Sequence, residues 1–129
     1  MNKELKSFFW FRFPVYSYAA VILLYSALKD PVPKKYQWIP HLDKWLHAAE
    51  YALLGYLVIR MIKSIESHFS NKKFIFLSIS YSTVYGALME LYQRFIPYRS
   101  ADIIDLTVDF IGATIGTLIY FKIFMKRPD

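Results

Sequence analysis

Ionisable side chains stand at the ends of the apolar stretches of this chain and inside them. Six of them are His47, Glu50, Glu90, Asp102, Asp105 and Asp109. Histidine and clustered carboxylates are residue types that can exchange protons near neutral pH or bind cations. An ionisable group at membrane depth is costly unless it pairs or lines a wet cavity. These residues are therefore candidates for a functional site.

The spacing of the polar residues predicts which helix faces point inward, because residues three or four positions apart share a face. One stripe is Asp43, His47 and Glu50; a second is Ser78, Ser82, Gly86 and Glu90; a third is Asp105, Asp109, Gly112 and Gly116. Small residues at this spacing allow helices to approach closely in lipid. We expect the helices with the second and third stripes to pack along these tracks, with their carboxylates facing each other. Packing alone is the usual role of Gly112 and Gly116.

The composition predicts one integral membrane domain, residues 1–129. The 129 residues are 56% hydrophobic and 19% aromatic, which is too apolar for an ordinary soluble domain. There is no cysteine, which excludes disulfides, thiolate metal sites and a cysteine nucleophile. The net charge of +6 does not indicate nucleic-acid binding, because the basic residues lie between the apolar segments. We expect no nucleic-acid partner.

Four apolar segments of about 20 residues each predict four membrane-spanning helices. They cover about 8–28, 43–62, 74–95 and 101–124. The first is expected to be retained rather than cleaved as a signal peptide, with Pro14 tolerated in its first turn. Pro31, Pro33 and Pro40 separate the first helix from the second. The expected fold is an all-α, four-helix transmembrane bundle.

Basic residues predict the orientation of this bundle, since cytoplasmic loops carry an excess of Lys and Arg. The basic residues that flank the two termini and the connection between the second and third helices favour a cytoplasmic location for both ends of the chain. The acidic residues and His47 then lie toward the outer face. We expect a multi-pass protein of the cell membrane with an outward-facing polar pocket.

Five carboxylates in a small bundle cannot all stay ionised without partners, because like charges raise one another's pKa. The candidate cations are Lys44, His47, Arg94 and Arg99. A purely structural ion-pair network is one explanation. Buried ion pairs stabilise a fold only weakly, so we favour a functional site.

Two longer strings carry a family resemblance. They are D-K-W-L-H-A-A-E-Y-A-L-L-G from Asp43 to Gly55 and Y-G-A-L-M-E-L-Y-Q-R-F-I-P-Y-R-S-A-D-I-I-D from Tyr85 to Asp105, followed by D-F-I-G-A-T-I-G from Asp109. From about residue 43 to 124 the chain resembles the VanZ-like family of small bacterial membrane proteins, named after a protein implicated in lowered teicoplanin sensitivity. The resemblance implies a membrane protein of the cell envelope, with a possible link to glycopeptide resistance.

The resemblance also implies a set of site residues. The family pattern falls on Asp43, Lys44, His47, Glu90, Gln93, Arg99 and Asp105, and it places Asp109 where the family has Asn. The Asp at that position is a departure that adds a charge or a proton at the deepest point of the site.

The first hypothesis for these residues is an enzyme acting on a lipid or a lipid-linked envelope precursor. Arg99, helped by Lys44 or Arg94, would hold a phosphate by charge-assisted hydrogen bonds. His47 and Glu90 would act as general acid or base, with Asp105 as a third catalytic candidate. Asp43, Glu50, Gln93, Asp102 and Asp109 complete the expected substrate site. No Gly-x-Ser-x-Gly or His-Glu-x-x-His motif indicates a serine hydrolase or a zinc protease.

Three alternatives stay open. The carboxylates and His47 could ligate a metal, most easily magnesium bridging to a phosphate, although no spacing motif predicts a metal site. The pocket could bind a lipid-linked intermediate without turnover. The carboxylates could relay protons in a transporter, which would need a homo-oligomer because four helices enclose little space. The sequence identifies no cofactor.

Overall fold

The computed structural model describes residues 1–27, 34–36, 38–97 and 102–125. Within these ranges the chain is all-α and contains no strand. The first helical segment is α1 (Lys3–Ser7), η1 (Phe8–Arg12) and α2 (Phe13–Ser26) in succession. After a short turn η2 (Lys34–Tyr36), the others are α3 (Leu42–Ile65), α4 (Asn71–Gln93), and α5 (Ile103–Tyr120) extended by η3 (Phe121–Met125). The predicted four-helix bundle is confirmed.

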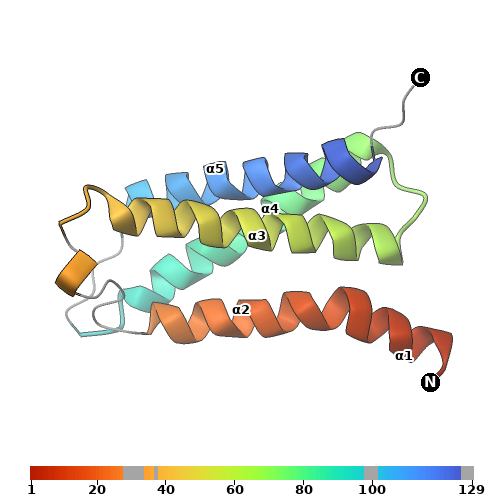
Figure 1. Cartoon of the computed structure of the whole chain (residues 1–129), viewed down its shortest axis with the longest axis horizontal. Helices are drawn as coiled ribbons and strands as arrows, with labels where there is room; N and C mark the ends of the chain where they lie inside the picture. The colour runs from red at the N-terminus through yellow and green to blue at the C-terminus, as the bar shows by residue number, and fades with distance from the viewer. Residues whose placement is uncertain (28–33, 37, 98–101, 126–129) are drawn as a thin grey trace.

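The four segments run alternately up and down (Figure 1). The start of α1, the end of α3, the start of α4 and the end of η3 lie at one end of the bundle, which we call the terminal end. The end of α2, the start of α3, the end of α4 and the start of α5 lie at the opposite end, which we call the polar end. This alternation places the start of α3, the end of α4 and the start of α5 together.

The N-terminal helix begins at Lys3, earlier than residue 8, so Pro14 lies inside it rather than in its first turn. A proline has no N–H and cannot donate to the carbonyl four residues before it, which is that of Trp10. The preceding turn is a π-helix, and Arg60 of α3 donates to the Trp10 carbonyl oxygen at 2.8 Å. The sequence analysis predicted this helix but placed its start too late, because charged residues precede the apolar run. Arg60 thereby joins the first helix to α3.

Side-chain caps set the starts of the later helices. Ser70 Oγ accepts from the N–H of Lys73 at 3.2 Å and caps α4. Asp102 Oδ1 accepts from the N–H of Ile104 at 2.8 Å and caps α5. Both residues hold an extended conformation just before the first helical turn, as capping residues do. The cap on α5 matters for the site, because it fixes Asp102 at the N-terminus of that helix.

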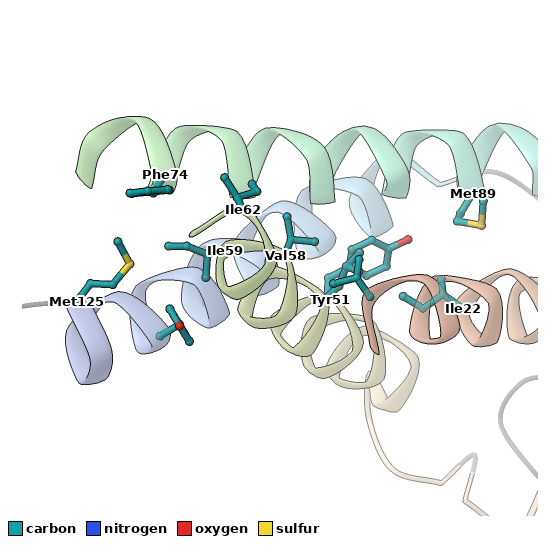
Figure 2. Packing of buried hydrophobic residues seen from close by; sticks show 11 residues of the cluster. Ile22, Tyr51, Val58, Ile59, Ile62, Phe74, Met89 and Met125 are labelled. Atoms are coloured by element: carbon teal, nitrogen blue, oxygen red, sulfur yellow. The ribbon is translucent and has the colours of Figure 1, made fainter. Parts of the chain in front are cut away.

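The buried apolar residues form one cluster that runs along α3 (Figure 2). Ile59, Ile62, Phe74 and Met125 gather toward the terminal end. Tyr51, Ile22 and Met89 lie toward the polar end. Of these residues, Tyr51 and Met89 also line the polar cavity described below.

Helices α3 and α5 share the closest interface of the bundle. A Cβ on Gly112 would overlap the carbonyl oxygen of Ala48, and one on Gly116 would overlap that of Ala52. The glycine track of α5 therefore packs on α3, and our prediction that it packs on α4 was wrong. Ala48 and Ala52 of α3 offer a smooth surface of their own, which the sequence analysis did not consider.

Three of the four helical segments are long and apolar enough to cross a membrane: Lys3–Ser26, Asn71–Gln93 and Ile103–Met125. Many large apolar side chains on these helices are exposed, among them Phe76, Val84 and Ile115. Lipid is the solvent that such surfaces require. Helix α3 carries more charge, but it is 24 residues long and contacts each of the other three segments.

Candidate functional site

Lys44 joins the start of α3 to the start of α5. Its Nζ lies 3.2 Å from Asp43 Oδ2 and 3.1 Å from Asp102 Oδ2, and it also pairs with Asp105 Oδ1. The lysine side chain is 24% exposed. Because its three protons are shared among three carboxylates, Lys44 has no donor left for a phosphate. The predicted role of Lys44 in holding a phosphate does not fit this arrangement.

Asp102 connects α5 to the end of α4. Its backbone N–H donates to Glu90 Oε2 at 3.0 Å, while its own carboxylate caps α5 and binds Lys44. The N–H of Ile104 and the ammonium of Lys44 hold the pKa of Asp102 below its usual range. Asp102 therefore connects two elements to α5, because its carboxylate pairs with Lys44 of α3 and its backbone N–H holds Glu90 of α4.

His47 reaches across from α3 to Asp109 in the interior of α5. Its Nδ1 donates to Asp109 Oδ1 at 2.9 Å, and its Nε2 lies 3.9 Å from Asp105 Oδ2. Asp109 is only 1% exposed. A hydrogen bond at Nδ1 fixes the orientation of the ring and leaves Nε2 as the reactive nitrogen.

Asp109 has a second oxygen with no such bond. Oδ2 is buried and has no hydrogen-bond partner among the described residues. It lies against α4 at Gly86, where a Cβ would come within 2.9 Å of it. Glycine at that position leaves the space that the carboxylate occupies. A buried polar atom without a partner costs free energy and is typical of functional sites.

A small cavity lies beside His47, between the end of α2, the start of α3 and the end of α4. Its volume is about 20 Å³, which is enough for about one water molecule. The lining includes Tyr25, Ser26, Asp43, His47, Glu50, Tyr51, Glu90 and Gln93. Its polar walls come from three helices that meet only in the folded chain.

Two grooves on the sides of the bundle reach the same region. One, of about 470 Å³, runs between α2 and α3 and is lined mainly by apolar residues such as Val21, Ile22 and Leu53, with Glu50 among them. The other, of about 350 Å³, lies between α4 and α5 and is bordered by Glu90, Arg94 and Asp102. Glu50 joins the first groove to the cavity, and Glu90 joins the second.

The structure brings most of the predicted site residues together. Asp43, Lys44, His47, Glu90, Asp102, Asp105 and Asp109 are linked by hydrogen bonds or ion pairs, and Glu50 and Gln93 line the adjoining cavity. Arg99 lies outside the described residues. Tyr51 also lines the cavity while its ring packs in the core. The sequence analysis missed Tyr18, whose hydroxyl donates to the Glu50 carbonyl oxygen at 2.9 Å.

The arrangement can transfer protons and recognise polar groups at the edge of a membrane. His47 is oriented by a carboxylate, and His47, Glu90 and Asp109 each offer one donor atom within 4.8 Å of the others. These features define a helical membrane protein with a cluster of ionisable residues at one end of the bundle. The VanZ/LLP1 family model matches residues 4–125, and the chain belongs to this family. A search of curated proteins and a search of solved structures found no match.

The family match extends the resemblance seen in the sequence. That resemblance began at about residue 43, whereas the match begins at residue 4 and includes the first helix. The structure gives that helix a place near the site, because Tyr25 and Ser26 line the cavity and Tyr18 binds the backbone of α3 at Glu50.

Proposed function

We propose that this protein binds a membrane lipid or a lipid-linked envelope precursor, with the polar head group at the cavity and the hydrocarbon chain in a groove of the bundle. The observation that carries the proposal is the position of Glu50 and Glu90. Glu50 and Glu90 each line both the polar cavity beside His47 and one groove on the side of the bundle. A lipid has the same two parts in the same order.

The hydrocarbon chain fits best between α2 and α3. This groove is lined mainly by Val21, Ile22, Leu46 and Leu53, and its polar end is Glu50. Apolar side chains at membrane depth favour an acyl or prenyl chain. The groove between α4 and α5 would accept the other side of the head group, where Arg94 can hold a phosphate.

The head group would meet carboxylates on the cavity side. Glu50, Glu90 and Asp43 line the cavity, while Lys44 is held by its three aspartates. Hydroxyl or amino groups on the ligand would donate to these acceptors. This side therefore favours a head group that carries hydrogen-bond donors in addition to a phosphate.

His47 would act on a bound head group as general base or acid. Its Nδ1 is held by Asp109, so Nε2 can take or give a proton, and the nearby Glu90 can serve as the second proton carrier. Asp105 positions both Lys44 and His47. A binding protein without turnover would use the same contacts. Whether a product forms distinguishes an enzyme from such a binding protein.

Proton transport is supported less well. The polar residues continue inward from Asp109 to Ser82 and to Ser78, which bonds to Thr117 and to the Gly55 carbonyl oxygen. Beyond Ser78 the interior is filled by Ile59, Ile62, Phe74 and Met125 (Figure 2). This apolar group closes the path before it reaches the terminal end.

We also propose that the chain crosses the membrane four times, with both termini in the cytoplasm and the site outside. Helix α3 packs among three other helical segments, and its charges at the polar end face partners in α5. The basic residues near the terminal end support the orientation. A link to glycopeptide resistance would follow if the bound lipid were a cell-wall precursor.

The experiment is to identify the lipids that remain bound after purification in a mild detergent. Native mass spectrometry of the wild type is expected to show a discrete lipid mass above the protein peak. Glu50→Gln is expected to lower its occupancy severalfold, and Glu66→Gln, at the other end of the bundle, is the matched control. A wild type with only a broad mixture of lipids, unchanged in Glu50→Gln, would contradict the proposal.

The same purified proteins can be used to distinguish an enzyme from a binding protein. The retained lipid class is added in vesicles to the wild type and to His47→Asn, and products are measured over time. A product with the wild type alone, while His47→Asn still retains the lipid, supports an enzyme. Retention without a product in either protein supports a binding role.

A further inference from the structure

The negative charge of the polar end exceeds the positive charge that the structure places there. Six carboxylates, those of Asp43, Glu50, Glu90, Asp102, Asp105 and Asp109, gather around Lys44 and His47, with Arg94 bordering the groove beside Glu90 and Asp102. Lys44 serves three of these carboxylates, all of them near the surface of the bundle. Among the described residues, His47 is the cation that lies near both Glu90 and Asp109, and Glu90 also accepts from the N–H of Asp102. A further cation would relieve the repulsion between Glu90 and Asp109.

His47, Glu90 and Asp109 are placed where they could hold such a cation. Each offers one ligand atom, and the three atoms lie within 4.8 Å of one another. The donors of a tetrahedral zinc site lie about 3.4 Å apart, given bond lengths of about 2.0–2.2 Å. Side-chain movements of about 1 Å would bring the three ligand atoms to this spacing around an ion.

The free oxygen of Asp109 is an independent sign of a ligand. Asp109 is 1% exposed, its Oδ2 has no partner among the described residues, and Gly86 makes room for it on the α4 side. Glu90, which follows Gly86 by one helical turn, is 7% exposed. The cavity of about 20 Å³ beside His47 and Glu90 can supply a water as a further ligand.

We propose that His47, Glu90 and Asp109 bind one divalent metal ion, with Zn²⁺ or Mn²⁺ as the ions that suit one imidazole and two carboxylates. Three protein ligands and an open position for water are the pattern of catalytic rather than structural metal sites. Asp105, 3.9 Å from His47 Nε2, is positioned to bond to a ligand or to a bound water. A bound ion would occupy His47 and Glu90, so it would replace their proposed role in proton transfer, whereas lipid binding in the grooves does not depend on it.

The test uses the full-length protein in detergent, stripped with EDTA and dialysed against ZnCl2, MnCl2, MgCl2 or CaCl2. We expect about one Zn²⁺ or Mn²⁺ per chain by elemental analysis. An ion at a hundredfold excess over its Kd is expected to raise Tm by at least about 5 °C. Glu90→Gln and Asp109→Asn are expected to lose binding at least tenfold, whereas Glu66→Gln, which changes a carboxylate at the other end of the bundle, keeps it.

A second measurement does not depend on the variants folding. X-ray absorption at the edge of the bound metal is expected to show one imidazole among oxygen ligands in the wild type. An imidazole-free spectrum, the absence of stoichiometric binding, or equal binding by Glu90→Gln, Asp109→Asn and the wild type would overturn the metal site. Lipid retention by the EDTA-stripped wild type is measured separately, so the failure of one proposal is distinguishable from failure of the other.

Discussion

His47 of α3 and Asp109 of α5 are joined by a hydrogen bond of 2.9 Å in the interior of the bundle. Asp109 lies six residues into α5, about 9 Å along its axis from Ile103. The pair therefore connects the charged surface around Lys44 to the polar residues inside the helices. Its carboxylate carries one bonded oxygen and one oxygen without a partner among the described residues, which makes this pair the centre of the site.

Asp109→Asn is expected to leave the free energy of unfolding unchanged or to increase it. The amide oxygen can still accept from His47, and the change removes a negative charge from the interior. Asp109→Leu removes the acceptor as well and should cost about 1–3 kcal/mol. Thermal unfolding of both variants in detergent, without added metal, tests this. A large loss in Asp109→Asn would mean that the charge itself holds α3 and α5 together.

Lys44→Met is expected to destabilise the polar end by about 1–3 kcal/mol, since it leaves three aspartates facing one another without a cation. Adding Asp105→Asn in the same chain should restore part of that loss by reducing the repulsion. The unfolding midpoints of the single and double variants measure the effect. Additive losses in the double variant would contradict the network.

Gly116→Ala is expected to destabilise the fold by about 1–3 kcal/mol or more, because the new Cβ overlaps the carbonyl oxygen of Ala52 and must push α3 away from α5. Gly86→Ala is the comparison, since its Cβ would meet side chains of Asp109 and Tyr51 that can shift. Thermal unfolding should rank Gly116→Ala as the less stable variant. If Gly86→Ala were the less stable variant, the contact of Gly116 with Ala52 would not be the tightest contact between the helices.

Asp102 gives the stability a dependence on pH. The N–H of Ile104 and Lys44 hold the pKa of Asp102 below its usual range, so its contribution is fully present above about pH 4 and is lost as pH falls through the folded pKa. Asp102→Asn can still cap α5 but lacks this charge. The difference in Tm between the wild type and Asp102→Asn should shrink from pH 6 to pH 3. A constant difference would show that the ion pair with Lys44 contributes nothing.

The absence of cysteine makes the orientation simple to test. A single cysteine is introduced by Ser67→Cys in the turn between α3 and α4, or by Phe95→Cys after α4. A maleimide that does not cross membranes should label Phe95→Cys in intact cells and Ser67→Cys only after lysis. The opposite labelling would turn the bundle over and put the site in the cytoplasm.

Much of the fold could be predicted from the sequence, because long apolar runs and prolines determine where helices form and end. The capping roles of Ser70 and Asp102 show why α4 and α5 begin where they do. Partner choice was harder to predict. Gly112 and Gly116 indicated a close helix contact, but Ala48 and Ala52 look like any other alanines in a helix, and only the folded chain shows that they are the partners.

The sequence predicted which residues form the candidate site, but it predicted their individual roles only in part. Spacing placed His47, Glu90 and Asp109 on inward-facing stripes, and the structure brings them together. The full occupation of Lys44 could not be predicted, since its three partners depend on how α3 and α5 are aligned. Because Pro14 has no N–H, the sequence indicates that the Trp10 carbonyl oxygen needs another donor. It does not indicate that Arg60 is that donor.

The most direct test of lipid binding is a map of where a lipid touches the bundle. Phosphatidylglycerol and a polyprenyl phosphate, each with a diazirine on the head group or on the chain, are reconstituted with the protein, irradiated and located by mass spectrometry. Head-group probes should label residues 43–50 and 89–94, and chain probes should label Val21, Ile22 and Leu53 beside the apolar groove. Labels from both lipids spread evenly over all lipid-facing helices would contradict the proposal.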